Sequence, residues 1–451
     1  MKRRIMGILL TMVLTAGLMT GCGSGGQEDN TASVSDTPDQ INTGEGNENA
    51  DKESSGKKAG SGKAVEITWL HHFQEEGIKV WVEDMIQSFE AENPDIHINV
   101  ETVPYNTYDQ TLKTKIASDD APMIFDLAGQ VYYEEYAKAG HLYDVTEIEG
   151  LENIDESYLP DGQVEGRQYA VPLDVNGYAV FYNKAIFDKY QLKVPTTLTE
   201  LKDICEILTK NGVQPFAAPM QELWGLQEYV DVAGFPVFGT PDWFTDKMNL
   251  TSHFADDEKF KEAIKNYFSF KPYWGEDPFG TNWDTAQNMV ATGEAAMVAN
   301  GSWAIDGITA KNPDCDVRVF AMPTTDDPSG AVMILRPGNG ICLYNSTDTD
   351  KLEAGKKFYT WLLGKDSGES YATNGFKIST AKGVDLSFSD GLMDIQSYPA
   401  EQVWNSSGLT LFSDEYYQIF YETILNYSME DKMDVDGLAE SLDNDFASIR
   451  N

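Results

Sequence analysis

Side chains able to form several hydrogen bonds at once stand beside predicted strand ends or in glycine-rich loops of this chain. They are His72, Asp126, Gln130, Asp174, Asn176, Gln221, Arg336 and Asn339. Asp126 comes late in an otherwise apolar strand, where a buried carboxylate needs a hydrogen-bonding partner or a helix to cap. In open α/β sheets, the loops after the carboxyl ends of strands gather ligand-binding groups. We therefore expect these residues to bind a small polar ligand.

Three tryptophans lie close to such loops and offer flat apolar surfaces. Trp303 follows a strand-like run, and Gly301 permits close approach of a ligand to the backbone. Trp224 interrupts a stretch rich in proline and glycine, where it serves equally well as a core residue. Trp404 stands in a loop between amide side chains. A sugar presents hydroxyl groups and an apolar C–H face, so this mixture of residues favours a carbohydrate ligand.

The sequence gives little support to metal binding or catalysis. His71 and His72 are adjacent, but no predicted helix places two histidines four residues apart. There is also no nucleophile elbow and no paired metal motif. We therefore expect no metal, no cofactor and no catalytic residue. A glycosidase that uses a carboxylate pair is the alternative from the enzyme class.

Alternating strands and helices are predicted to position these residues. Strands are expected at 65–69, 96–100, 123–127, 170–182 and 295–299. Helices are expected at 78–89, 108–116, 198–210, 257–268, 284–292, 352–363 and 413–425. This succession predicts an α/β fold in which helices flank mainly parallel sheets. Roughly 390 residues follow the N-terminal region, which is enough for two lobes with separate cores.

The N-terminal residues indicate export. Basic residues at 2–4 precede an apolar run from Ile5 to Leu18. This run is shorter than the ~20 residues that cross a bilayer, so residues 1–21 are expected to be a cleaved signal peptide.

The next residues indicate a tether. Thr20 and Gly21 before Cys22 are similar to a bacterial lipobox, in which the cysteine receives a diacylglycerol. From Gly23 to Lys63 the chain is polar and lacks aromatic residues. Residues 22–63 are therefore expected to be a lipidated cysteine followed by a disordered linker.

The chain is strongly acidic, with a formal net charge of −40. This charge argues against nucleic acid, anionic lipid or phosphorylated ligands as main partners. Besides Cys22, three cysteines remain, and their spacing fits no metal site. We expect them to be buried thiols with at most one disulfide.

An ordered series of short motifs runs through the folded part. The motifs are Phe89-Glu90-Ala91-Glu92-Asn93-Pro94, Lys115-Ile116-Ala117-Ser118-Asp119, Tyr136-Ala137-Lys138-Ala139-Gly140, Tyr169-Ala170-Val171-Pro172, Phe181-Tyr182-Asn183-Lys184, Gly293-Glu294-Ala295-Ala296-Met297 and Asn300-Gly301-Ser302-Trp303. The series resembles the extracellular solute-binding proteins of bacterial ABC importers, specifically the carbohydrate-binding group related to maltose-binding protein. The likeness runs from Val65 to Thr380 and fades after that point.

The resemblance implies a two-lobe fold of the type II periplasmic-binding-protein kind, whose lobes close over ligand in a hinged cleft. It places chain crossings near Asp174, near Met322-Pro323 and near Lys382. The first lobe would hold residues 64–174 and 322–382, and the second would hold residues 175–321 and 383–451.

The resemblance also implies a function and partners. The protein would be a monomeric, lipid-anchored receptor on the outer face of the cell membrane. It would capture a carbohydrate, most simply an oligosaccharide, and deliver it to the transmembrane subunits of an ABC permease. In this family the loop that matches Asp174 and Asn176 contacts sugar, and Trp303 faces the cleft. The same fold binding a peptide or a polyamine, and a sensory accessory role, are left open.

Overall fold

The computed structural model describes residues 64–240, 242–409, 411–430 and 433–450. The predicted signal peptide, Cys22 and linker lie outside these ranges. Within the ranges, none of the helices combines the length and apolar character that a membrane span requires.

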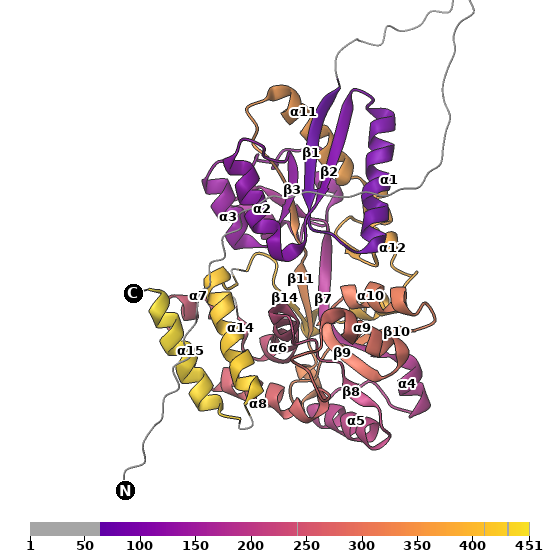
Figure 1. Ribbon diagram of the computed structural model, residues 1–451, viewed down its shortest axis with the longest axis vertical. Coiled ribbons are helices and arrows are strands. Elements are labelled where there is room, and N and C mark those ends of the chain that lie inside the picture. Colours follow the sequence, from indigo (N-terminus) through magenta and orange to yellow (C-terminus); the bar gives the residue numbers. More distant parts are fainter. Residues whose placement is uncertain (1–63, 241, 410, 431–432, 451) are drawn as a thin grey trace, which may run out of the picture. The chain divides into compact units, whose positions relative to one another are not determined.

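The first of the two large sheets has five strands in the order β2-β1-β3-β12-β6 (Figure 1). These strands are β1 (Val65–His71), β2 (Ile96–Thr102), β3 (Ile124–Leu127), β6 (Ala170–Pro172) and β12 (Gly340–Leu343). The helices of this lobe are α1 (Glu76–Glu92), α2 (Tyr105–Ala117), α3 (Gln130–Lys138), α11 (Thr349–Leu362) and α12 (Lys365–Gly375). Helix α12 packs on α1 and α11 packs on β1, so distant parts of the chain complete this lobe.

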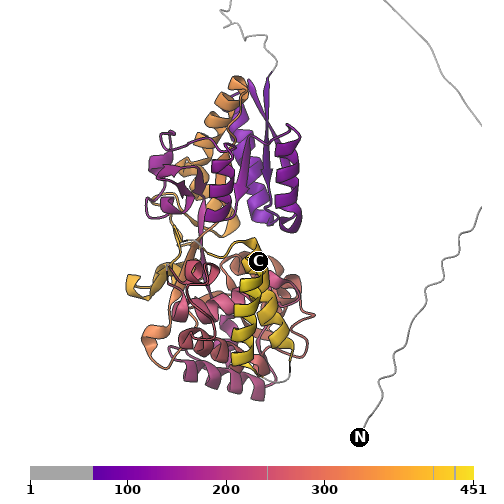
Figure 2. The same cartoon turned by 90° about the vertical axis from the view of Figure 1, so that its left-hand side faces the viewer.

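The second sheet has the order β14-β11-β7-β9-β8, and β10 and β13 also pair with β7. These strands are β7 (Asp174–Asn183), β8 (Gln214–Phe216), β9 (Ala295–Gly301), β10 (Val317–Phe320), β11 (Met333–Pro337), β13 (Ile378–Ser379) and β14 (Val403–Asn405). The helices are α4 (Lys184–Lys189), α5 (Leu198–Lys210), α6 (Leu223–Phe238), α7 (Trp243–Met248), α8 (Glu258–Ser269), α9 (Trp283–Thr292), α10 (Trp303–Lys311), α13 (Asp390–Gln396), α14 (Asp414–Met429) and α15 (Val435–Ile449). Figure 2 shows the two groups of elements from the side, joined by short connections.

Each sheet carries a hydrophobic core on both faces, and β7 shows how its sequence produces two of them. Successive side chains of a strand point to opposite faces. Tyr178, Val180 and Tyr182 therefore join the core formed with α6, α8 and α14. Ala179 and Phe181 join the core formed with α9, α10 and α13. The first sheet is arranged in the same way, with separate cores on its two faces.

The predicted two-lobe α/β fold is confirmed, but the sheets are mixed rather than mainly parallel. Strand β1 is parallel to β2 and β3, whereas β12 is antiparallel to both of its neighbours, β3 and β6. Strand β7 is antiparallel to β9, β10 and β11. The reason lies in the crossings between the lobes. Strands β7 and β12 each enter a sheet from the edge at which neighbouring strands end, so they run in the opposite direction.

The second crossing differs from the predicted position near Met322-Pro323. Strands β10 and β11 both pair with β7, so the chain stays with the second sheet as far as Pro337. It changes sheet at Gly338-Asn339, where β11 leads into β12. The loop after β10 therefore returns to its own sheet. Near the third crossing, β13 pairs with β7, while Lys382 donates its amide hydrogen to the Asn153 carbonyl in the first lobe.

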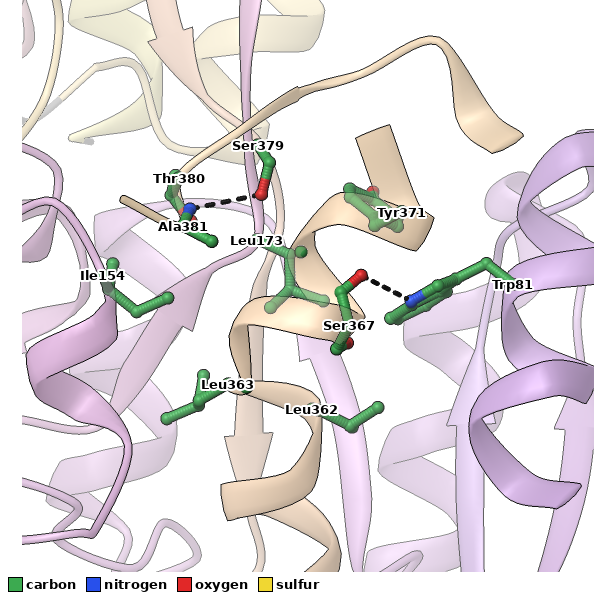
Figure 3. Close-up of a pocket in the computed structure, with 12 residues that line it drawn as sticks. Trp81, Ile154, Leu173, Leu362, Leu363, Ser367, Tyr371, Ser379, Thr380 and Ala381 are labelled. Carbon is green, nitrogen blue, oxygen red and sulfur yellow. Dashed lines mark hydrogen bonds between the residues drawn. The ribbon is translucent and has the colours of Figure 1, made fainter. Parts of the chain in front are cut away.

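Cys205, Cys315 and Cys342 are buried and free, as the prediction of buried thiols required. A small cavity lies where α11 and α12 pack beside the crossings (Figure 3). Its lining includes Leu173 and Leu362, and its volume is about 10 Å³, the space of a single water molecule. This cavity is too small for a sugar.

Candidate functional site

The predicted polar residues gather where the edges of the two sheets adjoin. Strand β6 leads into β7 across Leu173 alone, and β11 leads into β12 across Gly338-Asn339. The carboxyl ends of β1 and β3 and the amino end of β12 share this edge of the first sheet. The carboxyl ends of β9 and β11 and the amino end of β7 share the matching edge of the second sheet. We call this region the interlobe site.

Asp126 is the centre of a hydrogen-bonded group on the first lobe. Its Oδ2 lies 2.6 Å from His72 Nδ1 and accepts a 2.8 Å hydrogen bond from Asn339 Nδ2. Its side chain is fully buried, and its Oδ1 has no partner in the described part of the chain. Three residues predicted separately from the sequence are thus brought together. His72 and Asn339 remain partly exposed beside the buried carboxylate.

His72 and Asp126 shift each other's pKa in opposite directions, so that each stabilises the charged form of the other. Burial lowers the pKa of His72, but the adjacent Asp126 carboxylate outweighs this effect and holds the pKa above its usual value. Burial raises the pKa of Asp126, but His72 and the hydrogen bonds from its neighbours outweigh burial and hold the pKa low. The pair therefore favours an imidazolium next to a carboxylate.

A second polar group stands at the first crossing. Lys377 Nζ lies 3.5 Å from Glu75 Oε1 and 3.9 Å from Asp174 Oδ2, and its side chain is 8% exposed. Tyr371 donates to Asp174 Oδ2 over 3.4 Å. A Cβ on Gly338 would lie 1.7 Å from Asp174 Oδ1, so any larger residue at this position would displace the Asp174 carboxylate. Burial raises the pKa of Asp174, and the Lys377 ammonium opposes that shift.

The second lobe contributes Asn176, Arg336 and a pair of aromatic rings. Asn176 is paired in register with Arg336 and accepts a 3.2 Å hydrogen bond from Ser302 Oγ. The Arg336 guanidinium lies 4.8 Å from the centre of the Tyr178 ring. Trp303 meets the same ring edge-on at 5.5 Å. Trp303, which is half-buried, also covers Gly301, where a Cβ would lie 2.3 Å from the indole.

Behind Arg336 lie two carboxylates of α6 that the sequence analysis did not select. Arg336 Nη1 lies 3.2 Å from Asp231 Oδ2, and Tyr421 donates to Asp231 Oδ1 over 2.5 Å. Glu228 is 5% exposed, and its buried Oε2 has no hydrogen-bonding partner among the described residues. Burial raises the pKa of Glu228 well above its usual value, against the opposing pull of Arg336.

The remaining predicted residues do not join these groups. Gln130 donates to the Gln163 carbonyl over 2.6 Å within the first lobe. Gln221 is exposed before α6, and Trp224 packs edge-on against Trp283 at 5.7 Å. Trp404 donates to the Gly239 carbonyl over 2.9 Å and packs on Phe235, which ties it to the core of the second lobe.

Tyr105 is a residue of the site that sequence reasoning missed. Its side chain is 62% exposed, and its ring meets the His72 ring at 5.2 Å. It therefore stands beside the His72–Asp126 pair of the first lobe. Its position at the start of α2 was the available signal, because the strand before it ends at the same edge as β1.

A larger hollow lies elsewhere. Its volume is about 480 Å³, and its lining includes Leu142, Tyr143 and Asn345. Asn345 stands beyond the end of β12 that is opposite to Gly340. This hollow therefore opens at the far edge of the first sheet and contains none of the predicted site residues.

The interlobe site combines the groups that a neutral, hydroxyl-rich ligand needs. Asp126 Oδ1 and Glu228 Oε2 are acceptors without a partner in the described part of the chain, whereas His72, Arg336 and Asn339 carry donors. Tyr105 and Trp303 offer aromatic surface for an apolar sugar face. Within the described residues, no group of three or more His, Cys, Asp or Glu side chains could hold a metal ion.

Comparisons with known proteins bear on the family and the fold of the chain. The family model described as bacterial extracellular solute-binding protein matches residues 74–369. The multiple sugar-binding protein of Streptococcus mutans is 27% identical over 321 residues, which cover 70% of this chain and 75% of that protein.

Similar solved structures include SBP RafE in complex with raffinose, with a TM-score of 0.74 and 21% identity over 86% of this chain and all of that one. A chitin oligosaccharide binding protein has a TM-score of 0.74 and 20% identity over 85% of this chain and 98% of that one. At these identities the structural likeness establishes the fold.

Proposed function

The chain belongs to the bacterial extracellular solute-binding proteins, and from this premise we propose that it captures a carbohydrate between its lobes and delivers it to an ABC importer. The ligand is an oligosaccharide, because the site offers hydrogen-bonding groups from both sheets over an extended edge. The sugar-binding relatives described above support this choice of ligand class.

The observation that carries the proposal is the pairing of two incomplete half-sites. His72, Asp126 and Asn339 belong to the first lobe and its crossing, while Arg336 and Trp303 belong to the second. A ligand that contacts both halves is bound best when the lobes come together, so binding favours a closed form. Recognition then requires no covalent step, and the protein acts as a receptor without turning its ligand over.

Isothermal titration calorimetry with raffinose, maltotriose and a chitin oligosaccharide tests the proposal. We expect one of them to bind with a stoichiometry of one and a Kd in the micromolar range, about −8 kcal/mol. The same sugar should raise the melting temperature. Chromatography of the sugar after incubation separates a receptor from a glycosidase, since a receptor returns it unchanged. Binding of a polyamine or peptide with no response to any sugar would refute the carbohydrate assignment.

Anchoring and delivery complete the proposal. Diacylglycerol on Cys22 would hold the receptor at the outer face of the membrane, within reach of the permease subunits. The receptor would act as a monomer. Labelling of the full-length chain with radioactive fatty acid, followed by size-exclusion chromatography of the released domain, tests both statements.

A further inference from the structure

Helix α6 carries an unusual group of polar residues. The helix is apolar along most of its length and packs on β7, β9 and β11, yet it contains Gln227, Glu228 and Asp231. All three are buried. Since a buried polar group is costly unless it is hydrogen-bonded, each of the three requires a partner.

Two of the three have such partners. Asp231 is held by Arg336, Tyr421 and Gln227, and Tyr417 donates to Gln227 Oε1 over 2.7 Å. These contacts join α6 to β11 and α14, which explains why Asp231 and Gln227 are present. Glu228 takes no part in this network.

Glu228 lies in the part of α6 that adjoins the interlobe site. Asp231 stands one helical turn further along α6 and contacts Arg336, which lies 4.8 Å from the centre of the Tyr178 ring. Helix α6 begins after β8, and β8 is parallel to β9, whose carboxyl end lies at the interlobe edge, so Glu228 in the first half of α6 lies toward this edge. Oε2 of Glu228 is buried and unpartnered in the part of the chain that the structure describes. The side chain thus offers a buried, open acceptor on the part of α6 that adjoins Arg336.

We propose that Glu228 is a specificity-determining residue that accepts a hydrogen bond from a ligand hydroxyl at the base of the second half-site. This inference rests on the proposed carbohydrate-binding function. A ligand hydroxyl donates the hydrogen bond to Glu228. Asp231 receives the corresponding hydrogen bonds from Tyr421 of α14 and Arg336 of β11. A sugar that lacks a hydroxyl at this position leaves the carboxyl buried and unpaired, and is therefore rejected.

Two substitutions test the role of Glu228 in the full chain. Glu228→Leu keeps much of the side-chain volume but removes the acceptor, and Glu228→Gln keeps a carbonyl oxygen. Glu262→Gln, on the exposed side of the neighbouring helix α8, is the control for the loss of one negative charge from the same lobe. The probes are raffinose, maltotriose and the chitin oligosaccharide, measured by calorimetry together with the melting temperature of each variant.

We expect Glu228→Leu to raise the Kd at least tenfold while the melting temperature stays equal or rises, because an unpaired buried carboxyl is removed. Glu228→Gln should raise the Kd more than twofold, and Glu262→Gln should leave it unchanged. If Glu228→Leu does not fold, the Glu228→Gln result decides. If the wild type binds a sugar and the Kd of each Glu228 variant stays within twofold of the wild-type Kd, the role proposed for Glu228 is wrong, while the proposed function still stands. A wild-type chain that binds none of the three sugars would instead overturn the proposed function, and this inference with it.

Discussion

The buried imidazole of His71 is predicted to make the first lobe sensitive to acid. His71 is 1% exposed, and neither ring nitrogen has a partner among the described residues. The ring packs between Trp69, at 5.3 Å, and Phe73, at 5.2 Å. Burial in these surroundings lowers the pKa of His71 from 6.5 to about 4, although the Asp126 carboxylate opposes the shift.

The sign and size of the effect follow from linkage. In the unfolded chain His71 gains a proton below pH 6.5, whereas in the folded chain it stays neutral until about pH 4. Its neutral form therefore contributes stability that is fully present above pH 6.5 and is lost as the pH falls toward 4. The loss is about 2 kcal/mol at pH 5 and about 3 kcal/mol when complete.

Urea unfolding of the wild type and of His71→Phe at pH 8 and pH 5 measures the pH-dependent contribution of His71 to the free energy of unfolding. Phenylalanine keeps a ring between Trp69 and Phe73 but cannot titrate. Other titrating groups are present in both proteins, so their contributions cancel in the comparison. We expect the free energy of unfolding of the wild type to fall by about 2 kcal/mol more than that of His71→Phe between the two pH values.

His97→Gln is the control for losing a histidine as such, because His97 lies on the neighbouring strand β2 with its side chain 54% exposed. If the wild type and His71→Phe lose stability in parallel, the imidazole is protonated in the folded chain at pH 5, and the reasoning from burial is wrong.

Four further outcomes are expected. Trp303→Ala should weaken sugar binding by about 1–3 kcal/mol in calorimetry with a smaller loss of stability, and an unchanged Kd with a lower melting temperature would make it a core residue only. Arg336→Met should lower the free energy of unfolding by about 3–5 kcal/mol at pH 7.5, and by less at pH 5, because Asp231, whose pKa burial raises to about 6, then takes up a proton. Asp126→Asn should lower the pKa of His72 in an NMR titration and weaken sugar binding; an unmoved pKa would contradict the pairing. Cys22→Ser should shift the protein from the membrane fraction to the medium with binding intact, and retention on the membrane would refute the lipobox.

Local patterns accounted for the elements with the clearest periodicity, including strands β1, β2, β3 and β9 and helices α1, α5, α8 and α11. The strand at Val65 and the helix that follows it could be predicted because alternation and helical spacing are local consequences of burying one face. Helix α6 was missed for the same reason, since it is buried almost all round and so lacks a polar face that would reveal its period. The polar residues of α6 on an otherwise apolar segment were the signal that could have identified it as part of a site.

The candidate site was only partly accessible from the sequence. His72 and Asp126 could be chosen because they follow or end strands whose carboxyl ends meet at one edge. The partnership of Arg336 with Asp231 could not be anticipated, because the two residues are 105 positions apart and meet through the packing of α6 on β11. Trp404 was expected in a loop, but the structure places it in β14 with its ring 5.5 Å from that of Phe235, and its role in ligand binding stays a prediction.

The amino-acid sequence alone therefore determined the alternation of strands and helices, and it placed hydrogen-bonding residues at strand ends. These properties depend on contacts between near neighbours in the chain. The tertiary structure alone decided that the second crossing lies at Gly338-Asn339, that both sheets are mixed, and which polar residues satisfy one another. Strand order and the direction of each crossing decide these points, because they determine which distant side chains share a buried space, and no periodicity in the sequence records them.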